Sequence, residues 1–300
     1  MVEKILITGA SGMLGRMVFD AFRSFYNDAK ITTLSRSSFE ASENHVQLDL
    51  SNLEALSQFL NDQHFDVLVH CAAFVNLAYC KENPEETKRL HVKSPELLSS
   101  KIKKVYYIST DSVFDGQKDR YRETDETKPL NIYAETKHQG ELAVTANAYE
   151  AFIVRCNIFG FHFPMGKSLF EWAYKELAQR KEINGFSNVM FNPLYTGNLA
   201  EMLVQFHNLS PEPGTYHFGC KNPLSKYDFL IKVAATFGFD QDIIKPVELD
   251  PVSLGERRPL NTSLNTTRLE SSGVAVPGIE ECLKTLQRDF NQVYEYGQEF

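Results

Sequence analysis

The chain opens with the stretch Ile5-Leu6-Ile7-Thr8-Gly9-Ala10-Ser11-Gly12-Met13-Leu14-Gly15, which joins a short apolar run to a glycine-rich turn and an amphipathic segment. The three glycines leave backbone N–H groups uncovered at the start of a helix, where a dinucleotide pyrophosphate binds. Their G-x-x-G-x-x-G spacing differs from the G-x-G-x-x-G fingerprint, so a turn that serves packing alone is the alternative. The position directly after a first strand favours a dinucleotide site in a Rossmann-type fold.

Apolar runs alternate with helical patterns through the first half of the chain. The runs that we interpret as strands are 5–7, 31–34, 46–48, 67–69, 105–108 and 152–154. Such alternation is typical of a parallel sheet with crossover helices. Between the strands, Ser51-Asn52-Leu53-Glu54 has the pattern of a capping box, and Pro95 is expected to start a further helix. We therefore predict an α/β fold with a doubly wound parallel sheet.

The regular alternation ends after Gly160, and a smaller, discontinuous lobe of mixed α and β structure is expected beyond it. Trp172, Tyr174 and Leu177 suggest a helix, 214–219 a strand that rejoins the main sheet, and 279–290 another helix. The predicted dinucleotide-binding domain is 1–160 plus about 191–220, and the predicted substrate-binding lobe is about 161–190 plus 221–300.

Composition and charge limit the classes of partner. With 300 residues, 43% of them hydrophobic, and a formal net charge of −8, the chain lacks the basic surface that nucleic-acid binding requires. No apolar run approaches ~18 residues, so no membrane-spanning helix is expected. The first residues leave no room for a secretion signal, which predicts a cytoplasmic protein. The five cysteines are scattered without C-x-x-C spacing, which predicts free thiols and no metal site.

The end of the second predicted strand bears on the choice of cofactor. An enzyme that uses NAD usually has an acid there, and one that uses NADP has a cation. This chain has Arg36, with Ser35 and Arg16 nearby, so NADP(H) is favoured over NAD(H), although an arginine without a ligand is the alternative. Asp49 is expected near the adenine, and small residues follow the fourth strand. The candidate cofactor-binding residues are Gly9, Ser11, Gly12, Met13, Leu14, Gly15, Arg36, Asp49, Leu50, Cys71, Ala72, Ala73, Tyr133 and Lys137.

Tyr133 and Lys137 are four residues apart in Tyr133-Ala134-Glu135-Thr136-Lys137, and on a helix they share one face. An isolated phenol has a pKa near ~10, and a neighbouring cation lowers that pKa. A tyrosine activated in this way can act as a proton donor or acceptor near neutral pH. The spacing also arises by chance, beside a solvated lysine, so its meaning depends on the surrounding motifs.

Those motifs resemble a known family. The fifth predicted strand ends in Ser109-Thr110-Asp111-Ser112-Val113-Phe114-Asp115-Gly116, the stretch 129–141 reads P-x-x-x-Y-A-x-T-K-x-x-G-E, and 257–265 reads R-R-P-L-N-T-S-L-N. With the glycine turn, they resemble the extended short-chain dehydrogenase/reductases, and within them the dTDP-4-dehydrorhamnose reductase branch, over nearly the whole chain. The resemblance implies hydride transfer from NAD(P)H to the C4 ketone of a nucleotide-linked 4-keto-6-deoxy sugar, in the synthesis of deoxysugars for cell-surface polysaccharides.

The resemblance also implies residue roles. Tyr133 would give the proton, the Thr110 hydroxyl would stabilise charge on the carbonyl oxygen, and Lys137 would bind the nicotinamide ribose and lower the pKa of Tyr133. The substrate, a nucleotide-linked keto sugar, is expected to meet Asp111, Ser112, Val113, Asn157 and Arg258, with Lys167 or Arg258 near its diphosphate. Homodimer formation is left open.

Other functions within this superfamily can be weighed from the residues. Sugar-nucleotide dehydratases place Asp-Glu after the catalytic threonine, and this chain has Asp111-Ser112, which disfavours dehydration. A 4-epimerase is still a possible function, although the sequence motif usual for epimerases at this strand end is absent. The same branch includes an NADP-binding regulatory subunit of methionine adenosyltransferase. A non-catalytic partner protein is therefore the second hypothesis.

Departures from the branch pattern are concentrated at the expected substrate contacts. Leu77-Ala78-Tyr79-Cys80-Lys81 stands where the reductases usually have Val-Asp-Lys-x-Glu, and Ser112 replaces a usual tyrosine. Asn157-Ile158-Phe159-Gly160 replaces an aromatic-containing stretch, and Ser263 stands where a basic residue is common. We expect each departure to influence which sugar fits.

Overall fold

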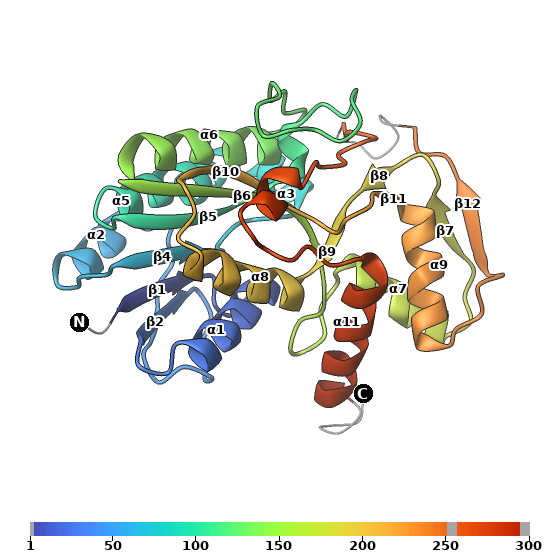
Figure 1. Cartoon of the computed structure of the whole chain (residues 1–300), viewed down its shortest axis with the longest axis horizontal. Helices are drawn as coiled ribbons and strands as arrows, with labels where there is room; N and C mark the ends of the chain where they lie inside the picture. Colours follow the sequence, from blue (N-terminus) through green and yellow to red (C-terminus); the bar gives the residue numbers. More distant parts are fainter. Residues whose placement is uncertain (1–2, 251–256, 295–300) are drawn as a thin grey trace.

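The computed structural model describes residues 3–250 and 257–294. Its main sheet has the strand order β10-β6-β5-β4-β1-β2-β3, all parallel, and β9 also pairs with β6 (Figure 1). The strands are β1 (Lys4–Thr8), β2 (Lys30–Ser35), β3 (His45–Gln47), β4 (Val67–His70), β5 (Lys104–Thr110), β6 (Glu150–Phe159), β9 (Pro193–Tyr195) and β10 (Gly214–Phe218). Strand order reverses between β1 and β4, which confirms the predicted doubly wound fold.

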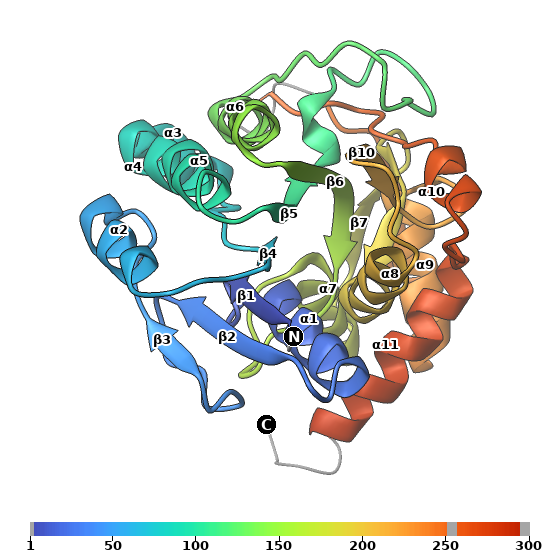
Figure 2. The ribbon, with the colours of Figure 1, turned by 60° about the vertical axis from the view of Figure 1, so that its left-hand side comes forward.

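Helices cover both faces of this sheet (Figure 2). One face is covered by α2 (Leu53–Asn61), α5 (Ser94–Ser99) and α6 (Ile132–Asn147), and the other by α1 (Met13–Phe25) and α8 (Thr196–Asn208). Successive strand residues point to opposite faces, so Ile5 and Leu6 belong to two different cores. The strands are nearly continuously apolar because both of their faces are buried.

The predicted strands are all present, with β3 displaced by one residue, and the predicted return of 214–219 to the main sheet is confirmed as β10. The predicted N-cap of α2, Ser51, is wrong by one position, because the N-cap is Asn52. The Asn52 side chain caps α2 by accepting the Ala55 N–H at 3.1 Å, while the Ser51 hydroxyl donates to Asp49 Oδ1 at 2.8 Å. Asparagine and serine are equally good N-caps, so the pattern alone could not separate them.

The prediction for Pro95 needs a similar correction, because this residue does not start a separate helix. Helical backbone runs without a break from α4 (Pro84–Lys88) through a π-helical turn (Arg89–Lys93) into α5. The Ser94 N–H donates to the Arg89 carbonyl, five residues back. Pro95 has no N–H to donate, and the π-helical turn before it, which is wider than an α-helical turn, accommodates it within the continuous helix.

A smaller lobe lies beside the main sheet, on the right in Figure 1. It contains the parallel pair β7 (Ile183–Phe186) and β12 (Ile244–Val247), the antiparallel pair β8 (Met190–Phe191) and β11 (Leu224–Ser225), and helices α7 (Leu169–Ala178) and α9 (Lys226–Phe237). The helices predicted around Trp172 and over 279–290 are confirmed as α7 and α11 (Ile279–Tyr294).

Two late elements contact the main sheet as well as the lobe. α11 contacts α9 of the lobe and also α8 and β9, and the short α10 (Thr267–Ser271) lies against β10. The remaining short helices are α3 (Leu77–Glu82) and a 3-10 turn (Asp111–Val113). The division of the chain at our stated boundaries stays a prediction.

Candidate active site

The glycine turn after β1 is packed too tightly for side chains. Gly9 has a φ of +71°, a left-handed conformation that glycine adopts without steric cost, and its N–H donates to the Leu34 carbonyl at 2.7 Å. A Cβ on Gly9 would lie 2.7 Å from the Ala72 backbone nitrogen, and one on Gly15 would lie 2.1 Å from the Gly9 carbonyl oxygen. The bare backbone of the turn therefore lies directly against the loop that follows β4.

The first turn of α1 suits an anionic ligand. Gly12 is its N-cap and makes no side-chain capping bond, and the turn contains no acidic residue. N–H groups at a helix start have no partner within the helix and carry the positive end of its dipole. This is the arrangement on which the sequence prediction of a pyrophosphate site rests.

A cavity of about 650 Å³ lies between the carboxyl ends of the main strands and the lobe. Its volume falls within the ~300–1,000 Å³ typical of small-molecule sites. The predicted residues that line it are Gly9, Gly12, Met13, Leu14, Gly15, Cys71, Ala73, Thr110, Asp111, Ser112, Tyr133, Lys137, Asn157, Lys167 and Arg258. Segments far apart in sequence thus meet in one space.

Some predicted residues are outside that lining, namely Ser11, Arg36, Asp49, Leu50, Ala72 and Val113. Two of them are core residues. Leu50 is buried in the core between the sheet and α2, and Val113 packs with Phe114, Tyr121 and Leu264 in a small cluster of its own. Their side chains do not face the cavity, because each is apolar and fills a neighbouring core.

Arg36 and Asp49 lie at the edge of the sheet, where the adenine end of a dinucleotide was expected. The Arg36 guanidinium is 5.8 Å from the centre of the Phe74 ring. Tyr79 lies on the same side, with its ring 4.9 Å from Phe74 and its hydroxyl donating to Glu86 Oε2 at 2.6 Å. Within this departure from the family pattern, Leu77 lines the cavity and Tyr79 does not.

Thr110, Tyr133 and Lys137 come together at the carboxyl end of β5. Asn131 caps α6 by accepting the Ala134 N–H at 3.0 Å, which places Tyr133 in the first turn of that helix. Lys137 is 2% exposed, and its Nζ donates to the Ile108 carbonyl at 2.7 Å and lies 4.0 Å from the centre of the Tyr107 ring. All three side chains line the cavity.

The electrostatics of this pair differ from the sequence expectation. Burial raises the pKa of Tyr133, and the hydrogen bond with the Thr110 hydroxyl acts in the opposite direction. Burial lowers the pKa of Lys137 to about 8, against a smaller upward influence of Glu141. The expected lowering of the phenol pKa by Lys137 is therefore wrong for the protein without ligands, because burial of the phenol dominates and the ammonium is directed at a backbone carbonyl.

Asp111 is a buried junction between β5, β6 and the segment that follows residue 257. It accepts hydrogen bonds from Asn157 Nδ2 at 2.7 Å, from Thr110 Oγ1 at 3.2 Å and from the Thr262 hydroxyl. Burial raises the pKa of Asp111, and these hydrogen bonds oppose the rise. Asp111 and Asn157, both predicted to meet the substrate, therefore also hold each other in place.

Besides Lys137, three cations bring positive charge to the cavity: Lys167, Lys226 and Arg258. Lys226 was missed by sequence reasoning. Burial and the Arg258 charge lower the pKa of Lys226, and Asp111 acts in the opposite direction. Lys226 is the first residue of α9, where a cation opposes the helix dipole. A lysine directly after the N-cap Ser225 is unfavourable for the helix, and this could have marked Lys226 in the sequence as a candidate functional residue.

One buried carboxylate holds the loop that follows β6. Glu171 accepts the backbone N–H groups of His162, Gly166 and Ser168 at 2.7, 2.6 and 2.7 Å, and His162 Nδ1 lies 2.9 Å from it. Although burial acts to raise it, these hydrogen bonds bring the pKa of Glu171 to about 2. His162 and Lys167 line the cavity from this fixed loop, and His162 is a second residue that the sequence did not single out.

The departure at Ser263 proves to be structural. Its side chain is fully buried, accepts the Arg120 N–H at 2.9 Å and donates to Asp119 and Asn261. Ser263 does not line the cavity, and its influence on the choice of sugar stays a prediction. A buried serine suits this position because it satisfies the backbone of a neighbouring loop.

Within residues 3–250 and 257–294, no helix is both long enough and apolar enough to span a bilayer. In the same part of the chain, no group of three or more histidine, cysteine or acidic side chains is arranged to hold a metal ion. The cysteines are free thiols, as predicted: Cys71 is half-buried, and Cys80, Cys156, Cys220 and Cys282 are buried.

Comparisons with known proteins agree with this arrangement. A family model described as the RmlD substrate binding domain matches residues 3–291. The chain is 28% identical over 285 residues to methionine adenosyltransferase 2 subunit beta of Mus musculus, covering 91% of this chain and 83% of that protein. It is also 28% identical over 281 residues to dTDP-4-dehydrorhamnose reductase of Mycolicibacterium smegmatis, covering 91% of this chain and 81% of that protein.

Two solved structures are similar over the whole fold. The dTDP-4-dehydrorhamnose reductase of Bacillus anthracis in complex with NADP has a TM-score of 0.85 at 23% identity, covering 96% of this chain and 100% of that one. A dTDP-4-dehydrorhamnose reductase from Clostridium acetobutylicum has a TM-score of 0.84 at 26% identity, covering 97% and 100%. Both a reductase and a methionine adenosyltransferase subunit are thus similar to this chain over most of its length.

Proposed function

This chain belongs to the RmlD substrate binding domain family, and from that premise we propose that it reduces the C4 ketone of a nucleotide-linked 4-keto-6-deoxy sugar with NADPH. One observation carries the proposal. Thr110, Tyr133 and Lys137 line the same cavity as the glycine turn, so a proton donor and a dinucleotide site share one space. The similarity to dTDP-4-dehydrorhamnose reductases supports the choice of reaction.

The residues present fit a dinucleotide. Gly9, Gly12 and Gly15 line the cavity with bare backbone, beside the start of α1, which has no side-chain cap. When bound, NADPH supplies the hydride. The proposed preference for NADPH over NADH rests on Arg36, because a guanidinium can bind the 2′-phosphate that only NADPH has.

Three side chains would act on the ketone and the cofactor. The Tyr133 phenol gives its proton to the ketone oxygen, and the Thr110 hydroxyl is a second donor to that oxygen as charge develops on it. Lys137 uses one N–H for the Ile108 carbonyl, which leaves two for the ribose hydroxyls. Its charge would favour the phenolate left on Tyr133 after proton transfer, against the burial that raises the pKa of Tyr133 in the protein alone.

The cations of the lobe wall fit the diphosphate of the sugar nucleotide. Lys226 and Arg258 line the cavity, and the charges of Arg258 and Asp111 both act on Lys226. Two phosphate-bearing ligands would therefore be held at separate places, one by backbone N–H groups and the other by side chains. This separation leaves the space near Tyr133 for the sugar.

The test is NADPH oxidation with a panel of nucleotide-linked 4-keto-6-deoxy sugars, comparing the unmodified protein with Tyr133→Phe. Loss of the proton donor should lower kcat by about 10²–10⁴-fold while NADPH binding, followed by fluorescence, stays within twofold. Tyr149→Phe is the matched control, because this phenol is 82% exposed and lies just beyond α6. Normal turnover by Tyr133→Phe would rule out Tyr133 as the donor.

A second candidate function is supported by the relatives themselves. Methionine adenosyltransferase 2 subunit beta is as similar to this chain as the reductase is. We infer as the alternative that the chain binds a dinucleotide and serves as a regulatory partner of that class of enzyme. Stoichiometric co-purification with a methionine adenosyltransferase, together with no NADPH oxidation on any sugar of the panel, would favour it.

A further inference from the structure

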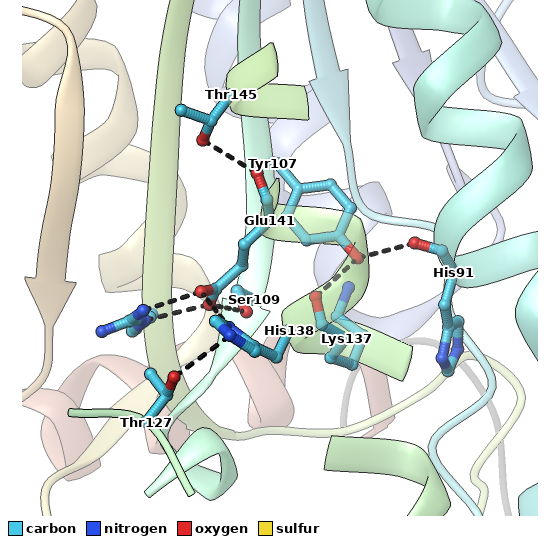
Figure 3. A network of polar contacts seen from close by, with 9 residues as sticks. His91, Tyr107, Ser109, Thr127, Lys137, His138, Glu141 and Thr145 are labelled. Atoms are coloured by element: carbon cyan, nitrogen blue, oxygen red, sulfur yellow. Dashed lines mark hydrogen bonds and ion pairs between the residues drawn. The ribbon is translucent and has the colours of Figure 1, made fainter. Parts of the chain in front are cut away.

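Glu141 lies one helical turn beyond Lys137 on α6 and is the centre of a buried polar network (Figure 3). Its Oε1 accepts the Ser109 hydroxyl at 2.5 Å and Arg155 Nε at 2.9 Å. Its Oε2 accepts Arg155 Nη2 at 2.7 Å and lies 3.2 Å from His138 Nδ1. Although burial acts to raise it, hydrogen bonds from His138, Arg155 and Ser109 lower the pKa of Glu141 to about 2.

These contacts join the helix that carries Tyr133 to the strand that carries Thr110. Ser109 directly precedes Thr110 on β5, and Arg155 is on β6, where the register pairs it with Ser109. On the other side of the helix, the Tyr107 hydroxyl donates to the His91 carbonyl at 3.0 Å and to the Lys137 carbonyl at 3.4 Å (Figure 3). The position of α6 over the end of β5 is thus fixed by Glu141, Arg155 and Tyr107, which do not line the cavity, together with Ser109, which does.

The ion pair is not arranged for stability alone. Arg155 buries its Nη1 atom without a hydrogen-bond partner among the described residues. A buried ion pair gains little net stability over apolar residues of the same volume, and an unpaired buried nitrogen reduces that gain further. The Glu141 charge is therefore better explained by its effect on the protonation of neighbouring side chains.

Lys137, one helical turn before Glu141 on α6, is a further neighbour on which this charge acts. The Cys71 thiol acts on Lys137 only when ionised, and burial raises the pKa of Cys71 to about 12. Burial likewise raises the pKa of Cys156, so both thiols are neutral at pH 8. The other titratable groups near Lys137 are neutral there too, since burial lowers the pKa of the two histidines and raises the pKa of the two tyrosines: His70, His91, Tyr107 and Tyr133. This leaves Glu141 as the ionised acid that acts on the ammonium.

We propose that Glu141 is a positioning residue, which fixes α6 against the ends of β5 and β6 and supplies the buried negative charge that keeps the Lys137 ammonium protonated. Its effect on the proton donor passes through Lys137, with no contact to substrate or cofactor. The inference rests on the proposed function for its catalytic consequence. Its electrostatic part concerns the protein itself and can be measured without a substrate.

The first experiment titrates Lys137 directly. Protein labelled with ¹³C at the lysine Cε is titrated by NMR, and the Lys137 signal is assigned by its absence from Lys137→Met. In Glu141→Gln the midpoint should fall by about one pH unit, because an opposite buried charge one helical turn away is lost. In Arg155→Met it should not fall, because Glu141 keeps its contacts with Ser109 and His138 and removal of a neighbouring cation does not disfavour the Lys137 ammonium.

These two substitutions break the same ion pair, which makes them a matched set. A purely structural role for the pair would move the Lys137 midpoint in the same direction in both variants, and that result would overturn the proposal. Each leaves a buried charge unpaired and can fail to fold. The double variant E141Q/R155M removes both charges, and its midpoint should fall as in Glu141→Gln. An unchanged midpoint in the double variant would also overturn it.

The second experiment connects this charge to turnover. In the double variant, the alkaline limb of the pH profile of kcat/KM for NADPH oxidation should move to lower pH by the same amount as the NMR midpoint. If the unmodified protein turns over no keto sugar, the proposed function fails while the NMR titration still decides the role of Glu141. If turnover is present and the limb stays in place while the midpoint moves, Lys137 is not the group through which Glu141 acts.

Discussion

The two ends of the cavity are built in different ways. The proposed cofactor end consists of backbone, from one continuous stretch in which Gly9 and Gly15 leave no space for a Cβ. The proposed sugar end consists of side chains from separate segments, including Asp111, Lys226 and Arg258. A backbone site depends on steric fit and tolerates almost no substitution, whereas a side-chain site can lose one donor and keep its shape. The difference implies a ranking of effects that mutation can test.

The largest effect should come from Gly9→Ala. Its φ of +71° disfavours a side chain, and the new Cβ would lie 2.7 Å from the Ala72 nitrogen. Left-handed strain and overpacking together should cost about 3 kcal/mol, with dinucleotide affinity at least tenfold lower. The measurements are urea unfolding and NADPH titration by fluorescence.

Gly238→Ala is the matched control, because Gly238 has nearly the same backbone angle, a φ of +74°, and a Cβ at this position would have no atom within 4 Å. It should cost only about 1 kcal/mol and leave cofactor binding unchanged. Equal losses of stability in the two variants would mean that the backbone angle, and not the contact with Ala72, limits this turn.

The same contrast explains what sequence could predict. The glycine turn and the strands follow from patterns within a few residues, and the structure has both where they were expected. Lys226 and His162 reach the cavity only because α9 and the loop after β6 fold back onto the strand ends, which no local pattern specifies. Val113 was misplaced for a related reason. It follows the predicted catalytic strand, yet its apolar side chain turns into a neighbouring core.

Electrostatics were the hardest part to predict. The spacing of Tyr133 and Lys137 correctly indicated one face of a helix, but the direction of the phenol pKa depends on how deeply the pair is buried. Burial is a property of the whole fold. The residue that balances the charge, Glu141, belongs to the same sequence motif, and its partner Arg155 is known only once β6 is placed beside β5.

A smaller effect than that of Gly9→Ala is expected at the sugar end, from Lys226→Met. Loss of one charge-assisted contact should raise KM for the sugar nucleotide about tenfold and leave NADPH affinity within twofold. The free energy of unfolding should not fall, because burial and Arg258 both disfavour the Lys226 charge. Steady-state kinetics and urea unfolding measure the two quantities.

Lys232→Met on the same helix is the control, since that side chain is surface-exposed and pairs with Glu280 at 2.7 Å. It should change neither KM nor affinity. A rise in the NADPH dissociation constant in Lys226→Met as large as the rise in KM would contradict the separation of the cavity into two phosphate-binding ends.

The smallest effect should come from Arg36, the one side chain on which the cofactor end depends for its choice between NADPH and NADH. Arg36 is exposed, and its guanidinium contacts the Phe74 ring at 5.8 Å. An exposed charge is weakened by solvent and salt, so Arg36→Ala should lower NADPH affinity only about fivefold and leave NADH affinity unchanged. The preference of the unmodified protein for NADPH over NADH should become smaller as salt is raised from about 50 to about 500 mM, because salt screens the Arg36 charge, and isothermal titration calorimetry can measure this.

Arg23→Ala is the control for the loss of a surface charge, because Arg23 is an exposed arginine that pairs with Asp20. Equal affinities for the two cofactors in the unmodified protein would show that the backbone end of the cavity binds the dinucleotide without reading its 2′ position.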